Sequence, residues 1–378
     1  MKIYKKAILP KGFKASGISC GIKKSGKLDL ALFYSNLPAH AACLFTINKI
    51  PAAPVILCKS LLKKNNVFKA IIANSGNANC FNGTNGLKDA QATAMALAKT
   101  LDIKKESILV SSTGIIGRRL PVEKIKSGLL NLVRNLSYRG IDSAKKAIMT
   151  TDTFSKELSV NFKIKGKAIS ICGVAKGAGM IAPDMATLLV FILTDANIAK
   201  DILKKSLRSS VGKSFNSITV DGCMSTNDSV ICLANSAAGN VRITNSKDAQ
   251  LFNQALDVVC IELAKLIVRD AEGASKFIQI KITKAKNPNQ ARKAALAIAN
   301  SNLFKTAIYG ENPNFGRIIA AIGASGVNVV EKDLKMKVSS LNKKDIFVDV
   351  DLSQGSSSAI VYTSDLTPRY IKINAEYN

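Results

Sequence analysis

Residues 173–193 of the chain read GVAKGAGMIAPDMATLLVFIL. Three glycines and a proline come before a small residue, Ala186, and a threonine, Thr187. The last six residues, 188–193, are all apolar, which is the pattern of a fully buried strand. A threonine in front of a strand is also what β-propensity alone favours, so this stretch by itself does not identify a site.

The rest of the chain alternates between strand-like and helix-like patterns. Short apolar runs at 70–73 and 108–110 lead into small polar residues, as buried strands do where they meet loops. Residues 159–162 and 168–172 flank Lys165-Gly166-Lys167 and predict a hairpin. Helical spacing of apolar residues predicts helices at 86–101, 121–136, 248–268 and 288–301. This mixture indicates an α/β or α+β fold, and the pattern does not separate the two.

Length and composition exclude several classes of protein. A chain of 378 residues and 40.3 kDa can bury a sizeable core or two coupled cores. No apolar run approaches the roughly 20 residues of a membrane-spanning helix. The single histidine, His40, excludes sites that need two, such as the H-E-x-x-H zinc motif. The eight cysteines have no C-x-x-C spacing, which argues against structural zinc, and their apolar surroundings indicate reduced thiols of a cytoplasmic protein.

The net charge of +28 suggests an anionic partner such as nucleic acid or a membrane surface. However, the 44 lysines outnumber the 10 arginines and are spread along the chain, with no block of five or six basic residues. Aromatic residues make up only 6% of the chain, so platforms for base stacking are scarce. We therefore expect the charge to be surface composition. A basic nucleic-acid-binding protein remains the alternative that is not an enzyme.

Several further segments combine glycine, asparagine, serine and threonine beside apolar runs. Polar loops at strand ends are favoured places for binding and catalysis, although ordinary turn chemistry explains each one alone. These segments lie at residues 74–79, 111–114, 221–228, 270–276 and 310–317.

Considered with residues 173–187, these segments resemble the ornithine acetyltransferase family of arginine biosynthesis, also called glutamate N-acetyltransferases. The resemblance begins at residues 9–14 and 20–23 and ends at 373–377, so it spans nearly the whole chain. Many motifs occur along the chain in the same order as in the family, which makes the resemblance specific. Between the two ends it includes residues 73–79, 112–114, 149–153, 176–187, 220–222, 225–228, 272–274 and 310–317.

The resemblance implies an α+β fold with αββα layers, similar to N-terminal-nucleophile hydrolases. It also implies that the precursor cuts itself between Ala186 and Thr187, which produces an alpha chain, 1–186, and a beta chain, 187–378. We expect these chains to share one core rather than to form two linked domains. The implied assembly is a heterotetramer of two alpha and two beta chains.

After cleavage, Thr187 would carry both a hydroxyl nucleophile and a free α-amine. An α-amine has a pKa of about 8 and can act as the base without any histidine. The resemblance assigns the oxyanion hole to Thr113 and Gly114. A hydroxyl and a backbone N–H aimed at the developing charge contribute about 3–4 kcal/mol.

The resemblance also implies which residues contact substrate. Thr151 is the near alternative to Thr150, because the two threonines are adjacent. Lys176 suits a substrate carboxylate and Glu272 suits an amino group, so together they could orient ornithine or glutamate. The implied substrate contacts are Thr150, Lys176, Thr187, Glu272 and Asn374.

The implied reaction moves an acetyl group from N2-acetylornithine to L-glutamate by a ping-pong route through acetyl-Thr187, with ornithine leaving first. No metal and no organic cofactor are implied, and acetyl-CoA as a further donor is left open. The partners are small molecules, not nucleic acid or membrane. The enzymatic alternative is an aminopeptidase or amidohydrolase of the same mechanistic class, in which water replaces glutamate.

Two departures from the family pattern are visible. The chain ends at Asn378, about one residue before a terminal threonine that many members have, and Asp184 stands where an uncharged residue, or Ser or Asn, is usual. Because the resemblance begins by Leu9, the eight residues before it are too few for a targeting peptide, and we expect a cytoplasmic location.

Overall fold

The computed structural model describes residues 1–182 and 188–376, and the chain divides into two compact units. Unit 1 comprises Met1–Gly177, Thr187–Gly212 and Ser225–Leu263. Unit 2 comprises Ala178–Ala186, Lys213–Met224 and Ala264–Asn378. Each unit has its own sheet and its own hydrophobic core.

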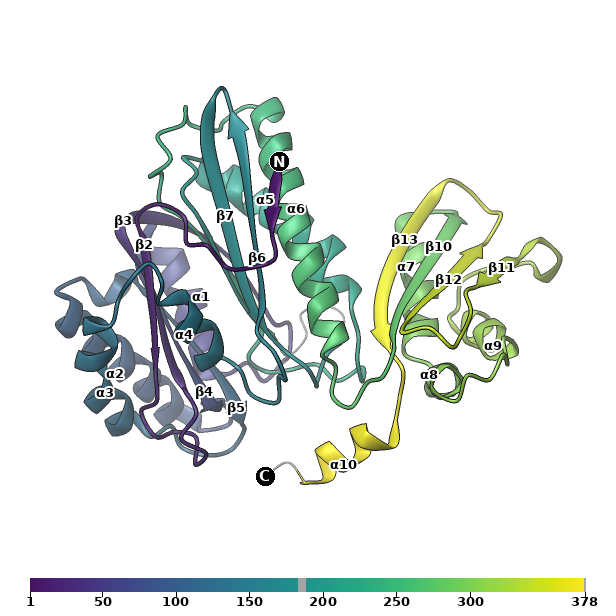
Figure 1. Ribbon diagram of the computed structural model, residues 1–378, viewed down its shortest axis with the longest axis horizontal. Coiled ribbons are helices and arrows are strands. Elements are labelled where there is room, and N and C mark those ends of the chain that lie inside the picture. The colour runs from purple at the N-terminus through teal and green to yellow at the C-terminus, as the bar shows by residue number, and fades with distance from the viewer. Residues whose placement is uncertain (183–187, 377–378) are drawn as a thin grey trace. The chain divides into compact units, whose positions relative to one another are not determined.

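The sheet of unit 1 contains nine of the described strands, in the order β1-β6-β7-β8-β9-β3-β4-β5, with β2 paired to β3. The long strand β3 pairs with β2 up to Ser35 and with β9 from His40 onward. It also pairs with β4, with a shift of register between Tyr34 and Ala39. This change of partner lets one sheet form two facing halves (Figure 1). The strands are β1 (Lys2–Tyr4), β2 (Phe13–Ile18), β3 (Leu30–Phe45), β4 (Val67–Asn77), β5 (Ile108–Ile115), β6 (Lys156–Ile164), β7 (Lys167–Lys176), β8 (Leu189–Thr194) and β9 (Ser229–Ala234).

The two halves of this sheet enclose a common core. Ile71 of β4 and Leu193 of β8 belong to the same buried cluster, and the rings of Phe33 and Phe191 approach to 4.8 Å between centroids. The alternate residues of β4, such as Ile72, face the opposite way into a second cluster with helices α1, α2 and α3. The helices of unit 1 are α1 (Ala53–Lys64), α2 (Gly83–Leu101), α3 (Val122–Arg134), α4 (Ile141–Ala147), most of α5 (Lys200–Lys213) and the greater part of α6 (Ser246–Arg269), with the 3-10 turn η1 (Lys105–Ser107).

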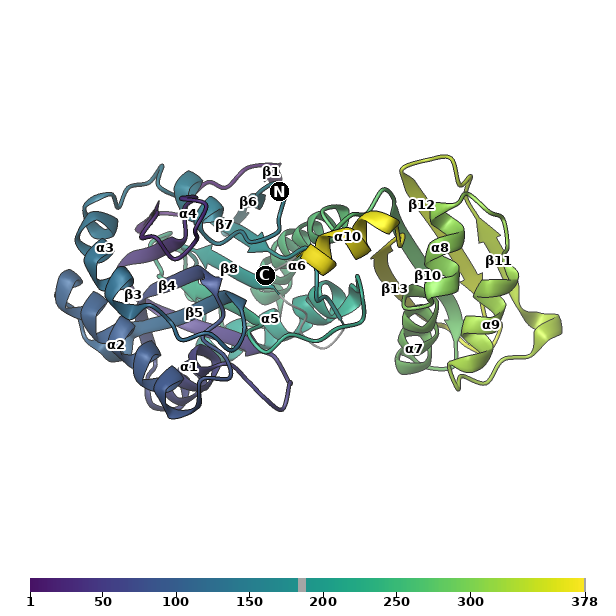
Figure 2. The same ribbon diagram turned by 90° about the horizontal axis from the view of Figure 1, so that it is seen from below.

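Helices also cover the outer face of β6 and β7. A Cβ on Gly173 of β7 would lie 2.7 Å from Val259 of α6, so α6 packs directly on this strand. Ser210 of α5 donates a hydrogen bond to Asp257 of α6 at 2.6 Å, which joins α5 to the same layer. Unit 1 is therefore layered helix, sheet, sheet, helix (Figures 1 and 2), and the expected αββα fold is confirmed.

The predicted elements are present. The hairpin is β6–β7, and its turn residues Lys165 and Gly166 have φ values of 46° and 80°, as a type I′ turn requires. The apolar runs at 70–73 and 108–110 lie in β4 and β5. The predicted helices correspond to α2, α3, α6 and α7 (Pro288–Ala299).

The sheet of unit 2 has the order β11-β12-β10-β13 and is covered by α7, α8 and α9. Ile280, Ile298 and Ile322 are part of a core that belongs to this unit alone. Residues before and after the predicted cut share the core of unit 1, as expected, but unit 2 adds a core of its own, because the second sheet has an apolar face that its own helices bury. The remaining elements of the unit are β10 (Phe277–Ala285), β11 (Lys335–Val338), β12 (Asp345–Asp351), β13 (Ser357–Ser364), α8 (Asn302–Tyr309), α9 (Gly316–Ala324), α10 (Pro368–Glu376), η2 (Phe215–Ser217) and η3 (Glu331–Asp333).

Two observations bear on the class of protein. Among the described residues, no helix combines the length and the apolar character that crossing a membrane requires. All eight cysteines are free thiols, and burial raises the pKa of Cys58 and of Cys232 to about 12. Such thiols stay protonated and pack as small apolar side chains.

Candidate active site

Thr113 and Gly114 lie near the end of β5, beside the end of the parallel strand β4. Gly76 of β4 pairs with Gly114 before the register shifts at Asn77. Gly114 has a φ of +132°, and a Cβ there would lie 2.4 Å from the carbonyl carbon of Gly76, so glycine is required. The sheet therefore holds the Thr113 hydroxyl and the Gly114 amide in place.

Lys176, the last residue of β7, reaches Thr113 across the interior of unit 1. Its Nζ donates a hydrogen bond to Thr113 Oγ1 at 3.2 Å, and each of the two residues is 3% exposed. A hydroxyl that accepts from an ammonium group keeps its own proton for donation, and the positive charge polarises it. This pair is suited to stabilise a developing negative charge.

Asp152 connects the segment before β6 to the end of β7. Its Oδ1 accepts hydrogen bonds from Lys156 Nζ and from the Gly177 amide, the latter at 2.7 Å, and its Oδ2 accepts from the Thr150 amide at 2.8 Å. Burial acts to raise the pKa of this carboxyl. The charges of Lys156 and Lys176 and the hydrogen bonds outweigh burial and hold the pKa at about 2. Asp152 is thus a buried anion that positions the backbone of Thr150.

Lys23 is a half-buried cation in this part of unit 1. Its Nζ donates to the carbonyl oxygens of Leu28 and Met149, each at 2.7 Å. Burial lowers the pKa of this ammonium to about 8, although Asp29 and Asp152 act to raise it. Lys23 therefore fixes the residue that precedes Thr150. Thr150 and Thr151 are both half-buried.

Asn227 and Asp228 directly precede β9. The Asn227 side-chain amide donates to the carbonyl oxygens of Ala78 and Ser112, at 2.6 and 2.8 Å. Asp228 is fully buried, and its Oδ1 accepts from the Leu188 amide at 3.0 Å. Burial raises the pKa of this carboxyl well above its usual range.

The predicted cleavage pair, Ala186 and Thr187, lies outside the described residues, as do Asp184 and Asn378. The neighbour of Thr187, Leu188, is described, and it leads into β8.

Glu272 and Asn374 meet in unit 2. The Asn374 side-chain amide donates to Glu272 Oε2 at 2.9 Å. Gly179 lies against the same carboxylate, since a Cβ there would be 2.2 Å from Glu272 Oε2. The Glu272 amide also donates to the Ala178 carbonyl at 3.0 Å. The glycine-rich stretch that precedes the predicted cleavage point therefore packs on the predicted substrate carboxylate.

Asp221 holds the same stretch from another direction. Its two oxygens accept hydrogen bonds from the Met180 amide at 2.7 Å and the Ile181 amide at 2.9 Å. The Tyr370 hydroxyl donates to Asp221 Oδ2 at 3.2 Å. Burial and the negative charge of Asp221 raise the pKa of Tyr370, which keeps its hydroxyl a donor. Asp221 thereby ties residues 180–181 to α10.

The predicted site residues that the structure describes fall into two groups. In unit 1, Lys176 contacts Thr113, and Thr150 is connected to β7 through Asp152. In unit 2, Glu272 contacts Asn374. Five charged or polar residues that organise these groups were not predicted as site residues from the sequence. Each of them lies in one of the motifs that carry the family resemblance. These residues are Lys23, Asp152, Asp221, Asn227 and Asp228.

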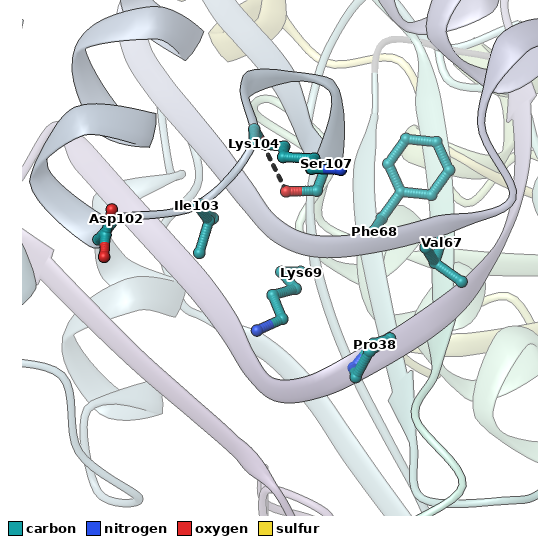
Figure 3. Close-up of a pocket in the computed structure, with 8 residues that line it drawn as sticks. All are labelled: Pro38, Val67, Phe68, Lys69, Asp102, Ile103, Lys104 and Ser107. Carbon is teal, nitrogen blue, oxygen red and sulfur yellow. Dashed lines mark hydrogen bonds between the residues drawn. The ribbon is translucent and has the colours of Figure 1, made fainter.

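A separate pocket of about 460 Å³ lies at the opposite end of β4 and β5 (Figure 3). Ser107 donates a hydrogen bond to the Lys104 carbonyl at 2.6 Å along its wall. None of the predicted site residues that the structure describes lines this pocket, so it is distinct from the two groups above. Its lining residues are Pro38, Val67, Phe68, Lys69, Asp102, Ile103, Lys104 and Ser107.

Comparisons with known proteins agree with the resemblance seen in the sequence. The profile of the ArgJ family matches residues 14–378. The chain is 45% identical to "Arginine biosynthesis bifunctional protein ArgJ" of Caldanaerobacter subterraneus subsp. tengcongensis, over 98% of this chain and 97% of that protein. It is 42% identical to "Glutamate N-acetyltransferase" of Methanocaldococcus jannaschii, over 97% of each. A solved structure of ornithine acetyltransferase complexed with ornithine from Mycobacterium tuberculosis is 37% identical, covers 50% of this chain and 99% of its own, and has a TM-score of 0.46.

Proposed function

Since this chain belongs to the ArgJ family and is a glutamate N-acetyltransferase of arginine biosynthesis, we propose that it processes itself and carries the acetyl group on Thr187. The observation that carries the proposal is the family match over residues 14–378. The contact between Lys176 and Thr113, buried at the ends of two strands, supports it because acyl transfer requires donors that are fixed before charge develops.

The proposed maturation cuts the peptide bond between Ala186 and Thr187. The Thr187 hydroxyl attacks the Ala186 carbonyl, and the Thr113 hydroxyl and the Gly114 amide stabilise the oxyanion. The C–N bond then breaks as the proton lost by the hydroxyl is taken up by the departing nitrogen. The resulting ester is hydrolysed by water to the chains 1–186 and 187–378. The new α-amine of Thr187 becomes available as a base.

The proposed catalytic cycle uses the same oxyanion donors twice. The Thr187 hydroxyl attacks the acetyl carbonyl of N2-acetylornithine, and its proton passes by way of the α-amine to the departing ornithine amine. L-Glutamate then attacks the acetyl-Thr187 ester and leaves as N-acetylglutamate. Each half-reaction is an acyl transfer through one tetrahedral intermediate, which is the ping-pong pattern.

Charged residues of both groups are proposed to orient the substrates. Lys176 is the cation for a substrate carboxylate, and Glu272 is the anion for an amino group, with Asn374 holding the Glu272 side chain. Thr150 is proposed to contact substrate from the segment that Asp152 positions, with Thr151 as the alternative. Acetyl-CoA would enter as a second acetyl donor, and no organic cofactor or metal takes part in these steps.

We also propose a heterotetramer of two alpha and two beta chains in the cytoplasm. The eight free cysteines support a reducing compartment. In an oxidising compartment, exposed and half-buried thiols such as Cys223 and Cys20 would be prone to form disulfides. Light scattering of the native protein should give twice the mass of one 40.3 kDa chain pair.

The intact mass of the purified protein tests the maturation step. We expect two fragments, the second beginning at Thr187, and a single uncut chain of 40.3 kDa would contradict the proposal. Thr187→Ala should stay uncut and lose acetyl transfer, because no hydroxyl remains to attack. Thr187→Ser is the matched control and should still be cut. Transfer activity in Thr187→Ala would show that the nucleophile is another group.

The reaction products show whether glutamate or water accepts the acetyl group. Incubation with N2-acetylornithine should yield N-acetylglutamate in step with ornithine when glutamate is present. Release of free acetate at the same rate without glutamate would instead identify an amidohydrolase, in which water is the acceptor.

A further inference from the structure

We infer that Tyr370 is a positioning residue for substrate binding, because its hydroxyl, bonded to Asp221, holds α10 where Asn374 orients the Glu272 carboxylate. The inference rests on the proposed function, since it takes Glu272 as the anion for a substrate amino group. It concerns unit 2 alone, and only residues that the structure describes.

Glu272 lies in the connection between α6 and β10, and its side chain depends on another group for its orientation. The Asn374 side-chain amide donates to Glu272 Oε2 at 2.9 Å, and within the described part of the chain it is the one hydrogen-bond donor to this carboxylate. A half-buried glutamate side chain has several rotatable bonds, so a single donor decides where its charge points. The position of Asn374 therefore sets the position of the proposed anion.

Asn374 connects Glu272 to Tyr370. Its amide nitrogen carries two hydrogens. Besides bonding to Glu272, this nitrogen donates to the carbonyl oxygen of Tyr370, one helical turn earlier, at 3.0 Å. A shift of α10 at Tyr370 is thus passed directly to the Glu272 carboxylate.

α10 lacks the apolar contacts that usually fix a helix on a protein surface. None of its nine residues, all of which the structure describes, is buried. A helix of this length is not stable by itself in water, so its place depends on specific contacts. At its start, Thr367 Oγ1 donates to the Gly273 carbonyl at 2.7 Å, and a Cβ on Gly273 would lie 2.5 Å from the Tyr370 amide nitrogen. The first attachment of α10 is therefore to the residue that follows Glu272.

The Tyr370 hydroxyl supplies the second attachment, through its hydrogen bond to Asp221 Oδ2 at 3.2 Å. Asp221 is a fixed acceptor, because its carboxylate also accepts the backbone amides of Met180, Ile181 and Cys223, at 2.7, 2.9 and 3.0 Å. One attachment at the start of the helix leaves it free to turn. The second, through the Tyr370 side chain, fixes the rotation of α10 and so the direction in which Asn374 points.

The charges around Tyr370 keep its hydroxyl a donor. Burial, the negative charge of Asp221 and the hydrogen bond to Asp221 raise the pKa of Tyr370, and the charge of Glu272 adds to this effect. The phenol therefore stays protonated at every pH at which Glu272 is ionised and an amino group is bound as a cation. The attachment to Asp221 is present whenever Glu272 can serve as the anion.

Tyr370→Phe tests the inference, because it removes one hydroxyl while Asp221 keeps its backbone donors. The KM for N2-acetylornithine should rise about tenfold, the effect of losing one hydrogen bond to a charged group. The kcat per cleaved molecule should change by less than about twofold, because a bound amino group is held alike in the ground state and the transition state. The midpoint of thermal unfolding should be unchanged, since α10 has no buried residue among those described.

Tyr309→Phe is the matched control. Tyr309 is the last residue of α8, is 44% exposed and takes no part in these hydrogen bonds, so its KM and kcat should equal those of the wild type. Both variants should be cut at the wild-type rate, because Asp221 still holds residues 180–181. A Tyr370→Phe chain that stays uncut would overturn the inference, since the hydroxyl would then serve maturation.

An Asn374→Ala background separates positioning from a general effect on structure. Asn374→Ala should itself raise the KM for N2-acetylornithine, because Glu272 loses its donor. Adding Tyr370→Phe should then raise KM by less than about twofold further, since both residues act through the same chain of contacts. Full and independent effects of the two substitutions would overturn the inference.

Glu272→Gln distinguishes the inference from the proposed function on which it rests. It should raise the KM for N2-acetylornithine, and an unchanged KM would remove Glu272 from the proposed substrate site. A raised KM in Glu272→Gln together with an unchanged KM in Tyr370→Phe would overturn the inference alone.

Discussion

At the residue scale, the candidate site of unit 1 is organised around one buried ammonium. Lys176 contacts Thr113, and its positive charge acts on the carboxyls of Asp152 and Asp228. Because Lys176 is only 3% exposed, water and salt screen these interactions weakly. A single cation thus connects the oxyanion donor to the two carboxyls that position the neighbouring segments.

Thr113→Val removes one oxyanion donor while keeping the side-chain shape. Loss of this donor should lower kcat for acetyl transfer about 100- to 1000-fold. The rate should be measured per cleaved molecule, because the same donor serves maturation. Thr100→Val, whose hydroxyl bonds to the Ala96 carbonyl within α2, is the control and should keep kcat. An unchanged kcat in Thr113→Val would remove Thr113 from the oxyanion site.

Asp152 makes stability depend on pH in the acid range. Its pKa is about 2 in the folded protein against an ordinary 3.8, so the unfolded chain binds the proton more readily. The stabilisation is present above this range and is lost as the pH falls from about 4 to 2. Asp152→Asn should therefore lower the free energy of unfolding at pH 6 by about 3–5 kcal/mol, because the buried ammonium group of Lys156 loses its carboxylate partner.

The difference between Asp152→Asn and the wild type should shrink as the pH falls from 4 to 2, measured by denaturant unfolding. Asp142→Asn removes an exposed partner of Lys145 and should change stability by less than about 1 kcal/mol. A difference that stays constant between pH 2 and 6 would contradict the assignment of the low pKa to Asp152.

At the element scale, close approaches decide where helices can lie on the sheet. Gly140 is the N-cap residue that directly precedes α4, and a Cβ there would lie 1.7 Å from the Ala15 carbonyl oxygen of β2. The start of α4 therefore touches the backbone of β2. The residues that follow α4 include Thr150 and Asp152, so this contact also positions part of the candidate site.

Gly140→Ala should force α4 away from β2 and lower the free energy of unfolding by about 3 kcal/mol. Gly212→Ala is the matched control, because a Cβ in this exposed part of α5 meets no atom within 4 Å. That change should be neutral or raise stability by about 0.5–1 kcal/mol. Equal effects of the two substitutions on the denaturation midpoint would show that the close approach at Gly140 is not what determines stability.

At the scale of the whole molecule, the proposed cut does not divide the chain along its units. β8 and β9 of the proposed second chain lie between β7 and β3 of the first. Unit 2 also contains Ala178–Ala186, which belongs to the first chain. The two products of cleavage would therefore remain joined by strand pairing and by the shared core of unit 1.

Cleaved wild-type protein should elute from a native size-exclusion column as one species that contains both chains. The chains should separate only when denaturant disrupts the β7–β8 and β9–β3 pairings. Uncut Thr187→Ala should elute at the same volume. Dissociation of the cleaved chains in native buffer would be inconsistent with the interleaved strand order.

Much of the fold was predictable, because apolar periodicity is a local property. The spacing of apolar residues identified α2, α3, α6 and α7, and the turn at Lys165-Gly166 identified the β6–β7 hairpin. The order of small polar motifs was sufficient to identify the family. The separate core of unit 2 was not predicted, since a pattern of elements does not show which sheet each helix covers.

The sequence alone determined the fold class, the family and the polar segments in which the site would be sought. Only the tertiary structure decided that Lys176 contacts Thr113, 63 positions away along the chain, and that Asp228 holds the amide of Leu188, 40 positions away. Such pairings depend on strand order and register, which are set by packing over the whole sheet. The same packing buries the Asp228 carboxylate and so determines its pKa, which no local pattern of residues encodes.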